Sequence, residues 1–155
     1  MIIVSDTSAI TSLLQIGQER LLVQLYQSVV IPEAVAAELR RGHKTLPSFL
    51  QVVAVVDRNQ VHRLAAEIDL GEAEAIVLMV EGRGDLLLLD ERRGRRVALR
   101  EGIPVVGLLG LLTEARQRGL ISSLQETLHQ LETLAGFRVS THLKQNALRA
   151  TGENP

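Results

Sequence analysis

The chain has 155 residues and a formal net charge of −1, with 46% hydrophobic and 23% charged residues. It can therefore bury a core, which excludes a disordered chain. Cysteine is absent, which excludes a disulfide scaffold, a thiolate metal site and a thiol nucleophile. Only Tyr26, Phe49 and Phe137 are aromatic, which argues against a platform that stacks nucleic-acid bases.

No segment predicts a membrane span or a secretory signal. The longest nearly apolar run, Ile103–Leu112, is far too short to cross a membrane. The first residues, MIIVSD, lack the basic start and long apolar stretch of a signal peptide. We therefore expect a soluble cytoplasmic protein.

Short apolar runs alternate along the chain with segments of helical spacing. In chain order, this pattern predicts strand Met1–Ser5, helices Ser8–Ile16 and Gln18–Gln27, strand Ser28–Ile31, helix Pro32–Arg41, strand Leu50–Val56, helices Asn59–Ile68 and Glu72–Glu81, strand Asp85–Leu89, an arginine-rich helix ending at Glu101, strand Ile103–Val106, helices Leu108–Arg118 and Ser122–Leu134, a last short strand Phe137–Ser140 and helix His142–Arg149. No repeat or linker divides it, so residues 1–150 are expected to form one domain, with residues 151–155 as a frayed tail.

Strands that are apolar throughout and alternate with helices indicate an α/β fold. Such a sheet is parallel and has helices on both faces. In parallel sheets, ligands bind beyond the carboxyl ends of the strands. That rule points to Asp6 and Asp90, each of which follows an apolar strand.

Two further acids, Glu38 and Glu72, lie on predicted helices. Taken singly, each acid has an ordinary structural explanation. Asp6 and Asp90 could cap the helices that follow them, Glu72 lies in a first helical turn where the dipole favours acids, and Glu38 could be a solvated charge. Glu38 nevertheless follows Val35 by three residues, which puts it at the border of the buried face.

Together the four acids can converge on one cleft above the sheet. Carboxylates held close together repel each other unless they are protonated or bound to cations. Oxygen ligands with no cysteine or histidine among them favour Mg²⁺ or Mn²⁺ over zinc. Mg²⁺ or Mn²⁺ bound by carboxylates is typical of enzymes that hydrolyse phosphodiester bonds.

Four segments occur in the order that is typical of a PIN domain. They are Asp-Thr-Ser after the first strand, Ile-Pro-x-x-Val-x-x-Glu-Leu, Gly-Glu-Ala-Glu-Ala-Ile, and Leu-Leu-Asp before an arginine-rich stretch. The chain resembles in particular the VapC-like branch of prokaryotic PIN-domain proteins, from about Ile2 to Leu134. The resemblance implies a PIN-like three-layer α/β/α fold with a central parallel sheet of four or five strands, and a metal-dependent ribonuclease acting on single-stranded RNA.

Residue by residue, the resemblance assigns the catalytic and metal-binding acids to Asp6, Glu38, Glu72 and Asp90. Thr7 and Ser8 match the hydroxyl residues beside the first acid. Where many relatives have Asp, this chain has Glu72, with Glu74 as a substitute ligand, and Glu91 replaces a second Asp after Asp90. The number of metals, one or two, is therefore left open. A toxin of this branch would be a homodimer with a small antitoxin protein as its partner.

Five arginines lie within nine positions and supply the local positive charge that the whole chain lacks: Arg92, Arg93, Arg95, Arg96 and Arg100. They are either a solvated helix face or a patch that binds RNA phosphates. If they form such a patch, we expect its RNA-binding residues to be Arg92, Arg93, Arg95 and Arg96. Gly94 in their midst lowers helix propensity.

Two other α/β families with an acid after the first strand fit this sequence less well than a nuclease does. A haloacid-dehalogenase-type phosphatase needs a second Asp two residues after the first, where this chain has Ser8. A receiver domain needs an acidic pair before its first Asp and a late lysine, and neither is present. The remaining alternative is a catalytically silent PIN-like scaffold that acts by binding a protein partner.

Overall fold

The computed structural model describes residues 1–155, and its centre is one five-stranded parallel sheet. The strands are β1 (Ile2–Ser5), β2 (Ser28–Pro32), β3 (Leu50–Val53), β4 (Leu86–Leu88) and β5 (Val105–Val106). The helices are α1 (Thr7–Gln15), α2 (Leu21–Leu25), α3 (Glu33–Gly42), α4 (Arg58–Leu64), α5 (Leu70–Val80), α6 (Arg92–Arg100), α7 (Leu108–Gln117), α8 (Leu124–Leu134) and α9 (Thr141–Ala150).

The strand order is β3-β2-β1-β4-β5, and every neighbouring pair is parallel. From β1 the chain moves outward through β2 to β3, then returns to place β4 on the other side of β1. The direction of winding therefore changes between β1 and β4, and this switch point is where open α/β sheets bind their ligands.

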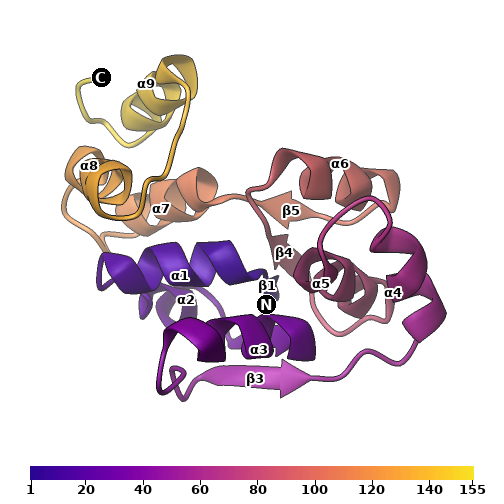
Figure 1. Cartoon of the computed structure of the whole chain (residues 1–155). Helices are drawn as coiled ribbons and strands as arrows, with labels where there is room; N and C mark the ends of the chain where they lie inside the picture. The colour runs from indigo at the N-terminus through magenta and orange to yellow at the C-terminus, as the bar shows by residue number, and fades with distance from the viewer.

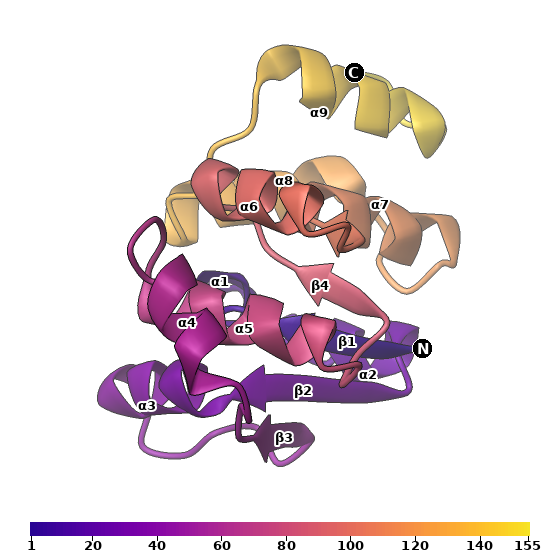
Figure 2. The same cartoon turned by 90° about the vertical axis from the view of Figure 1, so that its right-hand side faces the viewer.

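The strands bury side chains on both faces, because successive residues point to opposite sides of a sheet. Ile3 belongs to a core shared with α1, α2, α3, α7, α8 and α9, whereas Val4 belongs to a core shared with α4, α5 and α6. Figure 1 shows these two groups of helices on either side of the sheet, and Figure 2 shows α9 outermost beyond α7 and α8. The predicted three-layer α/β/α fold is confirmed, with five strands.

The C-terminal region differs from the sequence-based predictions in one element. Phe137–Ser140 is not a strand: it is an irregular connection between α8 and α9, with the Phe137 amide bonded to the Leu131 carbonyl and its ring packed on the core. Within residues 151–155, the Glu153 carboxylate accepts hydrogen bonds from Leu124 N and Gln125 N and pairs with Arg116 at 2.9 Å. These contacts anchor the chain end to α7 and the start of α8. None of the helices combines the length and apolarity needed to span a membrane.

Candidate functional site

The carboxyl ends of β1 and β4 lie side by side at the switch point. Asp6 directly follows β1, and its backbone N–H donates to the Leu88 carbonyl at the end of β4, at 3.2 Å. Asp90 comes two residues after Leu88. The parallel pairing therefore brings two acids from distant parts of the sequence to one edge of the sheet.

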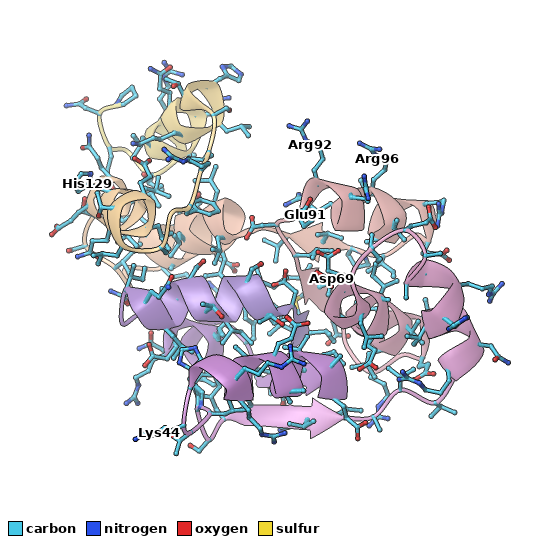
Figure 3. The ribbon with its side chains drawn as sticks, in the orientation of Figure 1. Lys44, Asp69, Glu91, Arg92, Arg96 and His129 are labelled. Atoms are coloured by element: carbon cyan, nitrogen blue, oxygen red, sulfur yellow. The ribbon has the colours of Figure 1, made fainter.

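A pocket of about 400 Å³ opens at this edge, and nearly all of the residues that line it are polar. Its acids come from three places in the fold: the start of α1, the middle of α3 and the start of α5. They are Asp6, Glu38, Asp69 and Glu72, with Thr7 and Ser8 beside them. Figure 3 shows Asp69 at the centre of the molecule, where α1, α3 and α5 approach one another.

Asp6 both caps a helix and lines the pocket. Its carboxylate accepts hydrogen bonds from Ala9 N at 3.1 Å and from Ser8 Oγ at 3.0 Å, so the predicted capping contact is present. Burial raises the pKa of Asp6 to about 7 against the effect of these bonds, and the charges of Asp90 and Asp69 raise it further. The two hydrogen bonds therefore do not offset the free-energy cost of burying the Asp6 carboxylate in its charged form.

Glu72 is 7% exposed, and no arginine, lysine or backbone N–H donates to its carboxylate. Burial raises its pKa to about 8, helped first by Asp69 and then by Asp6. Helix α6 packs directly on this side chain: a Cβ added at Gly94 would lie 2.8 Å from Glu72 Oε2. Glycine at this position lets α6 approach an acid that has no cationic partner.

Glu38 and Asp69 both lie next to Gly71, at the start of α5. A Cβ at Gly71 would lie 3.1 Å from Glu38 Oε1 and 3.7 Å from Asp69 Oδ1. Asp69 caps α5 by accepting from Glu72 N at 2.8 Å. Asp69 is not among the acids that the sequence pattern singled out, because it falls between the predicted helices Asn59–Ile68 and Glu72–Glu81. The signal was available, since an acid three residues before a glutamate at a helix start is the spacing of a capping box.

Asp90 lies at the same edge, but its carboxylate is directed to α7. Both of its oxygens accept from Leu108 N, at 3.1 and 3.2 Å. Burial raises its pKa, whereas the bond to Leu108 and the charge of Arg95 oppose the rise. Asp90 does not line the pocket that holds the other three predicted acids.

The two accessory acids have different surroundings. Glu91 lines a cavity of about 480 Å³ together with Asp69 and Glu72, next to the acidic pocket. Glu74 is directed elsewhere: it accepts from Ala34 N at 2.9 Å and pairs with Arg58 at 2.8 Å. The structure thus brings Glu91, and not Glu74, towards the acidic pocket.

The arginine-rich segment is helix α6, and its side chains divide into two sets. Three have partners within the protein: Arg93 donates to the Glu67 carbonyl, Arg100 pairs with the Glu67 carboxylate, and Arg95 donates to the Leu89 carbonyl. Arg92 and Arg96 have no such partner, and Figure 3 shows them projecting outward from α6.

The donor set of the acidic pocket suits a hard divalent cation. It consists of carboxylate and hydroxyl oxygens, which Mg²⁺ and Mn²⁺ prefer, and Thr7 Oγ1 is buried without a hydrogen-bond partner. No group of three His, Cys, Asp or Glu side chains is arranged to enclose an ion as it stands. The residues therefore fit such a cation by their chemistry and charge, with Asp6 and Glu72 as its buried carboxylates.

Comparison with known proteins gave one family. The PIN-domain family matches residues 2–153, almost the whole chain. Neither the curated proteins nor the solved structures gave a match to this chain. The extent of the match, together with acids at the switch point of a parallel sheet, shows that the chain belongs to the PIN-domain family, whose members are typically nucleases.

Proposed function

We propose that the chain is a VapC-like endoribonuclease that hydrolyses phosphodiester bonds of single-stranded RNA in the presence of Mg²⁺ or Mn²⁺. One observation carries this proposal. Asp6 and Glu72 are buried in one pocket at the switch point, and burial raises their pKa values to about 7 and about 8. A divalent cation offsets this desolvation and repulsion better than any group of the protein does.

Within this proposal, Asp6, Glu38 and Glu72 would hold the cation, and Asp90 would supply negative charge beside them. When bound, the cation would supply activation of water and neutralisation of the charge on the phosphodiester. Thr7 Oγ1, which is buried without a partner, is free to donate to a phosphate oxygen. Ser8 donates to Asp6 and so orients that carboxylate.

The biological part of the proposal follows from the resemblance to the VapC-like branch. The chain would be the toxin of a toxin–antitoxin pair in the cytoplasm, would form a homodimer and would be inhibited by a small antitoxin protein. Its target would be RNA, whose phosphates the free arginines of α6 attract.

A cleavage assay tests the activity. The purified chain should cut single-stranded RNA with Mg²⁺ or Mn²⁺ and stop when excess EDTA is added. Asp6→Asn should abolish cleavage while it keeps the helix cap, because Asn caps about as well as Asp. Equal cleavage in EDTA, or full activity of the variant, would contradict the metal-dependent mechanism. No cleavage under any condition would favour the silent scaffold.

A growth assay tests the toxin role separately. Expression of the wild-type chain should arrest growth, whereas expression of Asp6→Asn should not. If cells grew normally although the purified chain cleaves RNA, the toxin role would be contradicted and the nuclease activity would stand.

A further inference from the structure

A groove of about 930 Å³ lies between α6 and the connection that joins α8 to α9. We call it the α6–α9 groove. Its charged lining consists of Arg92, Arg95, Arg96, Arg138 and Asp90, and Phe137 contributes an aromatic surface. Because Asp90 follows β4, the groove begins at the same sheet edge as the acidic pocket.

Three of the four arginines of the groove have no partner within the protein. Arg92, Arg96 and Arg138 are all exposed, and none of them takes part in an ion pair or side-chain hydrogen bond. Arg93 and Arg100, which lie on the same helix, are instead engaged by Glu67. Three free guanidinium groups around one groove create a local positive field in a chain of net charge −1, and such a field attracts an extended anion.

The lining of the groove also contains apolar residues, which narrow the choice of anion. Phe137 and Val139 are half-buried in the lining, between the exposed Arg138 and Ser140. Phosphates on a cationic rim and bases on an aromatic or aliphatic surface describe a single nucleic-acid strand. A duplex has its base faces stacked inside and cannot offer them to apolar side chains. An acidic peptide could pair with the arginines, but it would also place carboxylates beside the apolar side chains of the lining.

We infer that the α6–α9 groove binds the RNA segment next to the phosphodiester in the acidic pocket, with phosphates on Arg92, Arg96 and Arg138 and a base on Phe137. This inference rests on the proposed function, since it names the path of that substrate. It assigns roles to two residues of the α8–α9 connection, Phe137 and Arg138, which lie far from α6 in the sequence. It also separates the free arginines of α6 from Arg93 and Arg95, which bond within the protein.

Binding of a labelled ten-nucleotide single-stranded RNA tests the inference, measured by fluorescence anisotropy at several salt concentrations. The full chain carries Asp6→Asn as a background, which keeps the helix cap and is expected to abolish cleavage, so that RNA is not cut. Arg138→Ala should weaken binding about five- to ten-fold and make the slope of log affinity against log salt shallower by about 0.7, the value for one lost phosphate contact. Phe137→Leu should weaken binding about five-fold without changing the slope, because it removes a stacking surface and no charge.

Arg83→Ala is the matched control. Arg83 is exposed and has no ion pair, and it precedes β4, at the opposite edge of the sheet from the groove. Its loss should leave affinity and slope unchanged. Thermal melting of each variant shows whether it is folded.

Three results would overturn the inference: no RNA binding by the background chain, equal binding by Arg138→Ala and Arg83→Ala, or displacement of RNA by an oligoglutamate of the same charge at equal concentration. The last result would assign the groove to an acidic protein segment. Failure of the proposed function looks different, because the wild type would then leave RNA intact while binding still depended on Arg138. That result would retain the groove as a nucleic-acid site.

Discussion

Glu72 and Glu74 lie two residues apart on α5 and are almost equally buried, at 7% and 4% exposure, yet they face different regions of the molecule. A helix turns about 200° over two residues, so the two side chains point to opposite faces. Glu74 meets the N–H of Ala34 and the guanidinium of Arg58. Glu72 instead lines a pocket with Asp69 and Asp6, whose charges raise its pKa.

The difference shows that burial alone does not distinguish a structural acid from a functional one. The free energy of burying Glu74 is offset by partners that the fold supplies, so this carboxylate stabilises the contact between α5 and its surroundings. Around Glu72 the fold supplies more negative charge, and burial first, then the charges of Asp69 and Asp6, raise its pKa to about 8. A group that destabilises the apo protein in this way is explained best by a ligand that the fold is built to hold.

Exchanging each acid for glutamine should separate the two roles most clearly. Glu72→Gln should lower RNA cleavage by roughly 10²–10³-fold, the cost of removing one preorganised electrostatic group. In metal-free buffer above pH 8 it should also raise the melting temperature, because it removes an uncompensated buried charge. Glu74→Gln should keep activity and lower the melting temperature by roughly 3 °C, since it weakens the contact with Arg58.

Parallel measurements of cleavage and thermal melting on both variants check this expectation. The opposite signs of the two melting shifts are its essential feature. If both variants lost stability and kept activity, Glu72 would be an ordinary structural acid, and the pocket would need another explanation.

Much of this arrangement could be predicted from the sequence. The alternation of apolar strands with helices predicted the parallel sheet, and parallel strands align their carboxyl ends, so Asp6 and Asp90 could be placed at one edge in advance. Phe137–Ser140 was predicted wrongly as a strand, because alternating side chains do not show whether a neighbouring strand is available to pair.

The surroundings of the acids could not be predicted, because they depend on tertiary contacts. The segment Gly-Glu-Ala-Glu-Ala-Ile does not show which glutamate meets Arg58, which lies on another helix. The division of the α6 arginines depends in the same way on where Glu67 lies. Asp69 was overlooked because a cap and a pocket residue look alike in sequence.

The pH dependence of stability sharpens the comparison further. The carboxyls of Asp6 and Glu72 have ordinary values of 3.8 and 4.5, and folding raises their pKa values to about 7 and about 8. At pH values between the ordinary and the raised pKa, each carboxyl keeps its proton in the folded state and has lost it in the unfolded state. The contribution of these groups to the free energy of unfolding should therefore fall by several kcal/mol as the pH rises from about 4 to about 8, at about 1.4 kcal/mol for each unit of pKa difference.

Denaturant unfolding in metal-free buffer at a series of pH values measures this decline. Glu72→Gln should make the decline shallower, whereas saturating Mn²⁺ should remove it from the wild type, because the cation binds the ionised form. A free energy of unfolding that stayed level from pH 5 to pH 8 without metal would mean that the two acids are not desolvated in the folded state.

Gly94→Ala should have the smallest effect, and it probes how closely α6 approaches Glu72. Alanine in a helix normally gains about 0.5–1 kcal/mol over glycine. At this position its Cβ would lie 2.8 Å from Glu72 Oε2 and 3.0 Å from Leu89 Cδ2, and Leu89 is fully buried. The flexible end of Glu72 can move aside, so the net loss of stability should stay near 1 kcal/mol, while displacement of the carboxylate lowers cleavage about ten-fold.

Gly42→Ala is the control for helix propensity, since Gly42 ends α3 and a Cβ there would meet nothing within 4 Å. It should stabilise the protein slightly and leave cleavage unchanged. The decisive comparison repeats Gly94→Ala in a Glu72→Ala background, where the carboxylate is gone. There the substitution should cost less stability than in the wild type, because only the contact with Leu89 remains. An equal cost in both backgrounds would show that the added Cβ clashes with Leu89 alone. Glu72 would then make no close contact with α6, and this difference between the Glu72 and Glu74 faces of α5 would be lost.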